Sequence, residues 1–109
     1  MNKINAIVKT PDEPVGHLEQ ISDTLKSYQN LVDGYVETLH IPQRRGLILI
    51  CNEEGKLRDL EPNITLAWNS TIFDVIRGTI VLVGAAGEHF TDCPLSLDEW
   101  QTLMKEWGN

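Results

Sequence analysis

Leu47-Ile48-Leu49-Ile50-Cys51, followed at once by Asn52-Glu53-Glu54-Gly55, is the stretch of sequence that decides the fold. The apolar run has no polar alternation, which predicts a central strand that is buried on both faces of a sheet. The acidic residues after it predict a turn, in which Gly55 is able to adopt a positive φ. The chain is therefore expected to leave its core at this point and enter a polar turn.

Further strands are expected on both sides of this stretch. Alternating apolar residues predict a strand from Lys3 to Lys9, and Tyr35 to Ile41 and Thr79 to Gly84 have strand-like composition. Ile72 to Ile76 fits either a short strand or a helical turn. Between Arg58 and Asn69 the pattern is weak, and Pro62 argues against regular structure there.

The segment from His17 to Gly34 has two interpretations. Apolar residues at spacings of three and four, from Leu18 to Val32, fit one amphipathic helix. Alternatively, His17 to Ile21 is a short strand, Thr24 is the N-cap of a helix, and Gly34 is the left-handed residue after the helix. The second interpretation is favoured, and the first stays open.

A helix near the C-terminus has the strongest local signals. Ser96 and Glu99 have the spacing of a capping box, and Leu95 and Trp100 that of a hydrophobic staple. The apolar face of this helix consists of Leu97, Trp100, Leu103 or Met104, and Trp107, with Gly108 after its end. Trp100→Ala is expected to be among the most damaging substitutions in the chain.

These elements predict the fold class and the domain organisation. A length of 109 residues is that of one domain, spanning residues 1–109. Several strands and two main helices, the second of them C-terminal, predict an α+β fold. We expect a largely antiparallel sheet of about four to five strands.

Three separated blocks of the sequence resemble a known family. The blocks are Gln29 to Glu37, Ile50 to Asn63, and Ile76 to Gly84. In this order and spacing they are similar to the domain of unknown function 3846, a small domain of bacteriophages, plasmids and integrative elements, chiefly of Gram-positive bacteria. The resemblance covers roughly Leu25 to Glu99 and departs from the family pattern at Asp33 and from Thr65 to Ile72. It implies a mobile-element accessory protein with no established activity or catalytic residues.

The charge balance and the apolar runs narrow the classes of function. Nine Lys and Arg against sixteen Asp and Glu give a net charge of −7, whereas phosphate contacts need a concentrated basic surface. Direct binding of nucleic acid is therefore not expected. The sequence has neither a secretory segment nor an apolar run near the roughly 18 residues of a membrane span, so we expect a cytoplasmic protein without membrane contact. Cys51 and Cys93 fit free thiols in a reducing compartment.

The polar residues after the central apolar run are the candidate site. They are Asn52, Glu53, Glu54, Lys56, Asp59 and Asn63. As a site, their carboxylates could hold a cation or act as acid and base. As a turn, Asn52 caps the strand end, the two glutamates are solvated and Asn63 closes a turn after Pro62. The turn is the favoured interpretation.

Catalytic and metal-binding patterns are weak elsewhere. The three histidines have no metal-ligand spacing to one another, and the His89–Cys93 spacing lacks further zinc ligands nearby. Cys51 lies in an apolar run, which is typical of an unreactive core thiol. The sequence therefore predicts no metal, no cofactor and no catalytic residue.

The leading functional hypothesis is an accessory protein that binds a protein partner without catalysis. Its contact regions would be the acidic turn and Trp68, which falls in an irregular polar stretch. One alternative is a protein, or an enzyme, that binds a small molecule or nucleotide around Asn52 to Asn63. Another is an acidic DNA mimic that counters a host defence. The sequence favours a non-enzyme and leaves the oligomeric state and the partner's identity open.

Overall fold

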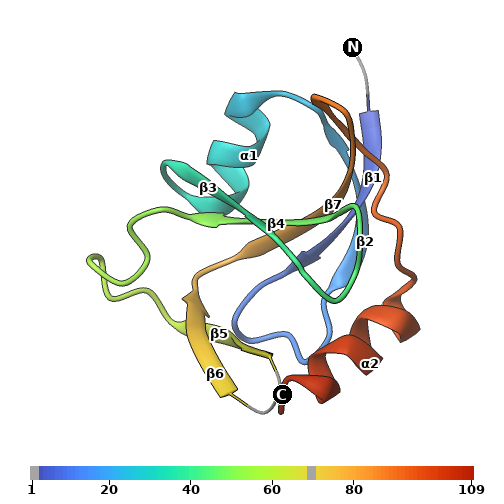
Figure 1. Cartoon of the computed structure of the whole chain (residues 1–109). Coiled ribbons are helices and arrows are strands. Elements are labelled where there is room, and N and C mark those ends of the chain that lie inside the picture. Colours follow the sequence, from blue (N-terminus) through green and yellow to red (C-terminus); the bar gives the residue numbers. More distant parts are fainter. Residues whose placement is uncertain (1–2, 69–70) are drawn as a thin grey trace.

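A computed structural model describes residues 3–68 and 71–109 (Figure 1). In chain order its elements are β1 (Lys3–Lys9), β2 (His17–Ser22), α1 (Leu25–Val32), β3 (Val36–His40), β4 (Leu47–Asn52), β5 (Pro62–Trp68), β6 (Thr71–Arg77), β7 (Ile80–Ala86), β8 (His89–Thr91) and α2 (Leu97–Glu106). The α+β class, with its second helix C-terminal, is confirmed.

The described strands form one large antiparallel sheet and one hairpin. The large sheet is six-stranded, with the order β2-β1-β7-β4-β3 and with β8 added to β7. The hairpin pairs β5 with β6. Every residue of β4 is buried, which confirms the prediction of a strand covered on both faces.

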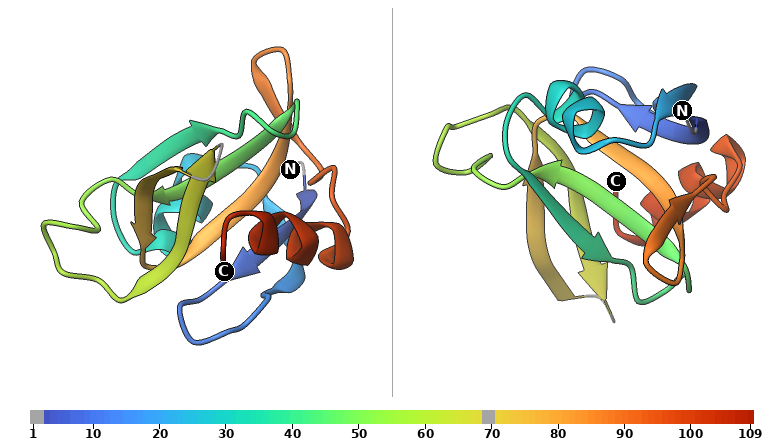
Figure 2. Two further views of the ribbon diagram at one scale, coloured as in Figure 1. Left: turned by 60° about the horizontal axis from the view of Figure 1, so that its bottom comes forward. Right: turned by 90° about the horizontal axis from the view of Figure 1, so that it is seen from above.

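Helices and the hairpin cover the two faces of the large sheet (Figures 1 and 2). On one face, Tyr28 and Val32 of α1 pack against apolar side chains of β1, β4 and β7. On the other, α2 and the β5–β6 hairpin enclose a larger core around Trp100, which is fully buried. The alternation of side chains along each strand supplies both cores.

Both helices begin as the sequence predicts. The Thr24 side chain accepts a hydrogen bond from the Ser27 N–H, so the interpretation with a strand followed by a helix is confirmed. Ser96 and Glu99 form the predicted capping box. The left-handed residue after α1 is Asp33, with φ 60°, and not Gly34 as predicted. Gly34 has a φ of 155° and is also required by close packing, because a Cβ there would lie 2.7 Å from Asn52 Nδ2.

Two other expectations are corrected. Pro62 does not exclude regular structure, because it is the first residue of β5, a strand position that tolerates a missing N–H. Gly55 is not among the residues with positive φ, and the left-handed residue of this turn is Asp59, with φ 53°. Gly55 serves close packing, since a Cβ there would lie 3.1 Å from the Arg77 carbonyl oxygen.

Candidate functional site

The loop of residues 53–61, between β4 and β5, is folded by its own backbone hydrogen bonds. The Arg58 N–H donates to the Glu54 carbonyl at 2.9 Å, and the Leu60 N–H donates to the Gly55 carbonyl at 3.0 Å. The loop projects from the body of the molecule (Figure 1). Its backbone therefore has a defined conformation although it contains no helix or strand.

Asn52 fastens the start of this 53–61 loop to α1. Its side chain accepts a hydrogen bond from the Glu54 N–H at 2.7 Å and donates to the Val32 and Asp33 carbonyls at 2.9 and 3.1 Å. The residue is only 4% exposed. Because these bonds satisfy carbonyl groups at the end of α1, the side chain of Asn52 joins helix, strand and loop.

The rest of the 53–61 loop is held by two arginines. Arg58 donates to the Asp33 carbonyl and pairs with the Asp33 carboxylate at 3.1 Å. Arg77, on β6, donates to the Leu60 carbonyl at 3.0 Å and lies 3.4 Å from the Asp59 carboxylate. The loop is thus tied to α1 on one side and to the hairpin on the other.

A hollow of about 240 Å³ lies between β3, β4, the 53–61 loop and β6. Its lining is Glu37, Cys51, Asn52, Glu53, Gly55, Lys56, Leu57, Asp74, Val75, Ile76 and Arg77. Two of its acids come from strands that the sequence argument did not connect, Glu37 on β3 and Asp74 on β6. Lys56 forms an ion pair with Asp74.

Cys51 is a buried thiol in the lining of this hollow. Its Sγ donates to Glu37 Oε1 at 3.9 Å. Burial, helped by the negative charges of Glu37 and Asp74, raises the pKa of the Cys51 thiol to about 12. The thiol therefore stays protonated near neutral pH and does not supply the thiolate that nucleophilic catalysis needs.

Three large apolar side chains are exposed around the 53–61 loop. Leu57, at its tip, is 86% exposed, and Tyr35 and Ile72 are each 65% exposed. Leu57 borders the hollow described above, Tyr35 borders a second one with Glu54, and Ile72 a third with Asp59. These side chains and hollows together form an uneven surface, on which exposed apolar side chains are surrounded by charged ones.

The structure distributes the predicted site residues over several places. Asn52, Glu53 and Lys56 share the first hollow, Glu54 lines the second, and Lys56 and Asp59 line the third. Asn63 lies apart from all three, and the side chain of Trp68 is outside the described residues. Sequence reasoning missed Glu37, Leu57 and Asp74. Only Leu57 had a signal, as a leucine within a charged turn.

Asn63 belongs to a different polar group, centred on Lys9. The Lys9 ammonium donates to Asn63 Oδ1, and Asn63 Nδ2 donates to the Lys9 and Gly78 carbonyls at 2.9 and 2.8 Å. Lys9 is 4% exposed. Burial lowers the pKa of its ammonium, and the negative charges of Glu13 and Asp12 partly offset this lowering. Asn63 therefore joins the end of β1 to β5 and to the turn before β7.

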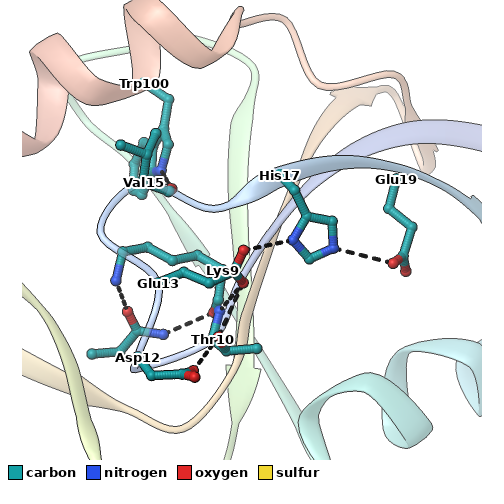
Figure 3. Close-up of polar contacts among 9 residues, drawn as sticks. Lys9, Thr10, Asp12, Glu13, Val15, His17, Glu19 and Trp100 are labelled. Carbon is teal, nitrogen blue, oxygen red and sulfur yellow. Dashed lines mark hydrogen bonds and ion pairs between the residues drawn. The ribbon is translucent and has the colours of Figure 1, made fainter.

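His17 lies between two carboxylates beside this group (Figure 3). Its Nδ1 is 2.8 Å from Glu13 and its Nε2 is 3.2 Å from Glu19. A neutral imidazole has one N–H, so both contacts are hydrogen bonds only when the ring is protonated. The hydrogen bond to Glu13 accordingly raises the pKa of His17.

The described residues contain neither a cluster of metal-ligating side chains nor a membrane-spanning helix. Within residues 3–68 and 71–109, no three His, Cys, Asp or Glu side chains gather to hold a metal ion. No helix among the same residues has the length and apolar character needed to span a bilayer. Both cysteines are free thiols.

Comparison with known proteins gives one match. The family model described as Domain of unknown function (DUF3846) matches residues 4–107. Neither a curated protein nor a solved structure matches the chain.

Proposed function

We propose that this chain, which belongs to the family described as Domain of unknown function (DUF3846), is a single protein-binding domain that acts without catalysis. Its contact surface would be the 53–61 loop and the hollows beside it. As the family resemblance implies, it would serve as an accessory protein of a phage, plasmid or integrative element, acting in the cytoplasm of the host.

The single observation that carries this proposal is Leu57 at the tip of an ordered loop. Exposed leucines are common on protein surfaces and need no explanation when they are scattered. Here, however, the 53–61 loop is held by hydrogen bonds to α1 and the hairpin, and it still leaves this side chain 86% exposed. Burying a leucine is worth about 1.5–3 kcal/mol. A partner that covers Leu57 gains this free energy without ordering the loop first.

The neighbours of Leu57 support the same interpretation. Tyr35 and Ile72 are also exposed, and each borders a hollow next to the 53–61 loop. Apolar points surrounded by charged side chains match the composition of protein interfaces, where an apolar centre lies within a polar rim. Glu53, Glu54, Lys56 and Asp59 would form that rim.

The alternatives have less support. A small-molecule site gathers its polar groups in one pocket, whereas the candidate residues are divided among three hollows of about 240, 390 and 520 Å³, and Asn63 lines none of them. A DNA mimic needs rows of free carboxylates, whereas Asp33, Asp59 and Asp74 pair with basic side chains of the chain itself. A thermal-shift screen with nucleotides and divalent ions tests the first alternative.

The deciding experiment compares two exposed leucines. The wild-type chain, Leu57→Ser and Leu18→Ser are each used as bait in a lysate of the bacterium that carries the gene. Leu18 is 61% exposed on β2, at the opposite border of the large sheet, and is the matched control. We expect a partner to be retained by the wild type and by Leu18→Ser and lost by Leu57→Ser. Equal capture by both variants, or the absence of any partner, would overturn the proposal.

The glutamates and the gene's surroundings provide two further checks. A Glu53→Ala/Glu54→Ala variant should weaken capture of the same partner, because both side chains belong to the proposed rim. Adjacent genes for conjugation or anti-restriction proteins would support the mobile-element assignment. A chromosomal housekeeping operon would contradict it.

A further inference from the structure

The outer edge of β3 is open beside the 53–61 loop. β3 pairs with β4 on one side, and no other described strand pairs with it. Figure 2 (left) shows β3 at the border of the large sheet. An unpaired strand edge presents backbone donors and acceptors that a strand of another chain can use.

The register identifies which backbone groups point outward. The Glu53 N–H donates to the Tyr35 carbonyl at 2.8 Å, and the Ile41 N–H donates to the Leu47 carbonyl at 3.2 Å. Hydrogen-bonded pairs alternate along an antiparallel ladder, so Glu37 and Leu39 face β4 in the same way. The N–H and C=O groups of the intervening residues, Val36, Thr38 and His40, therefore point away from β4.

The side chains beside this edge favour a basic partner. Glu37 and Glu53 are exposed, border the first hollow and form no ion pair with any described residue. A residue opposite Glu37 on an added strand would have its Cβ about 5 Å away on the same face of the sheet. A lysine or arginine at that position would meet the Glu37 carboxylate at the hollow, next to Leu57. The net charge of −7 also attracts basic partners.

We propose that the partner presents an extended, basic segment that adds to the outer edge of β3 as a further strand. This inference rests on the proposed function and specifies the partner's contact. Backbone hydrogen bonds from Val36, Thr38 and His40 hold the segment. A cationic side chain of the segment pairs with Glu37, and an apolar residue of the partner covers Leu57.

Proline substitution tests the outward backbone groups. Thr38→Pro removes an N–H that the β3–β4 ladder does not use, and prolines are tolerated on strand edges when the missing N–H faces solvent. Thr38→Val keeps the N–H and is the matched control. Because an interface hydrogen bond is worth about 1 kcal/mol, we expect Thr38→Pro to weaken partner capture about fivefold or more and Thr38→Val to change it less than about twofold. Glu37→Lys should weaken capture as well.

Two measurements do not depend on the unidentified partner or on the folding of the proline variant, and the second of them uses a defined probe. In the free protein, NMR-detected hydrogen exchange should be fast at the amides of Val36, Thr38 and His40 and slow at Glu37 and Leu39. The probe is a synthetic heptapeptide of alternating lysine and valine. It should shift the resonances of those three amides and slow their exchange, whereas a glutamate–valine heptapeptide should not.

The outcomes separate this inference from the proposed function. If Leu57→Ser abolishes partner capture while Thr38→Pro leaves it unchanged, the partner docks on the 53–61 loop and the strand-addition inference is overturned. If the basic peptide does not change the resonances and the exchange rates of the three amides, or if it shifts the resonances of residues elsewhere, the inference fails as well. Loss of capture in both Leu57→Ser and Thr38→Pro, with Thr38→Val unaffected, supports both.

Discussion

Two polar segments of the molecule, the β1–β2 connection (residues 10–16) and the 53–61 loop, are both held by hydrogen bonds but place their apolar side chains differently. In the connection, Glu13 accepts from the Thr10 N–H at 2.9 Å and contacts His17, and Trp100 Nε1 donates to the Val15 carbonyl at 2.9 Å. The Val15 side chain packs against the core around Trp100. In the loop, hydrogen bonds hold the backbone and leave Leu57 in solvent. The difference distinguishes a segment that fastens the fold from one that presents a side chain.

The largest expected effect comes from breaking the anchor of the connection. Trp100 is fully buried, lies edge-on to Trp107 and holds the Val15 carbonyl. Trp100→Ala should lower the free energy of unfolding by about 3–5 kcal/mol, because it leaves a cavity between α2 and the large sheet. Urea denaturation measures this loss. Trp100→Phe fills most of the space and should cost less; an equal loss would mean that the indole hydrogen bond, and not packing, dominates.

The Lys9–Asn63 group should give the next largest effect. Asn63→Ala leaves the Lys9 ammonium and two partly buried carbonyl groups without this partner, which should cost about 2–4 kcal/mol. Asn30→Ala, at an exposed asparagine of α1, should change stability by less than about 0.5 kcal/mol. The double variant Lys9→Met/Asn63→Leu removes both side-chain partners. Its loss in free energy of unfolding should be smaller than the sum of the losses of the two single variants, Lys9→Met and Asn63→Leu. Simple additivity in chemical denaturation would contradict the idea of one coupled group.

The pH dependence of the His17 contacts gives a smaller effect. The raised pKa of His17 means that its contribution to stability is present below its ordinary value of 6.5 and is lost as the pH rises through the folded-state value. The lowered pKa of Glu13, caused mainly by its hydrogen bond from the Thr10 N–H, gives a contribution that is lost in acid. Because His17 is partly exposed, we expect about 0.2–1 kcal/mol between about pH 5.5 and pH 8.5.

Comparison of histidine variants checks the source of this pH dependence. Denaturation of the wild type at both pH values should show lower stability at the higher pH, and His17→Gln should reduce the difference. His40→Gln, at an exposed position of β3, is the matched control and should retain the difference. If His17→Gln keeps the full pH dependence, the two carboxylate contacts do not stabilise the connection.

The sequence predicted the elements whose signals are local. The apolar run before Asn52, the N-cap Thr24 and the capping box of Ser96 and Glu99 each act within a few residues, and the corresponding structure follows from them. The first strand of the hairpin was not predicted, because Pro62 counts against a strand unless its position at the strand's first residue is known. Propensity alone does not contain that information. The second strand, β6, agrees with one of the two interpretations of Ile72 to Ile76.

The same distinction between local and long-range signals applies to the candidate site residues. Asn52 and Asn63 were grouped by their proximity in sequence, but their partners lie on α1 and on β1, and these pairings arise from the folded topology. Glu37 and Asp74 reach the hollow beside the 53–61 loop from β3 and β6, far apart in the chain. Long-range pairing therefore explains why Asn52 and Asn63 lie in different groups and why Glu37 and Asp74 were not predicted.

The smallest expected effect on stability tests most directly whether the 53–61 loop differs from the β1–β2 connection. Leu57→Ser should change the free energy of unfolding by less than about 0.5 kcal/mol, because an 86% exposed side chain loses little packing when truncated. Leu49→Ala, at a fully buried leucine of β4, should cost about 2–5 kcal/mol in the same urea titration. A loss of more than about 1 kcal/mol for Leu57→Ser would mean that Leu57 packs within the protein. The 53–61 loop would then be a second fastening segment, and its leucine would no longer be free to meet a partner.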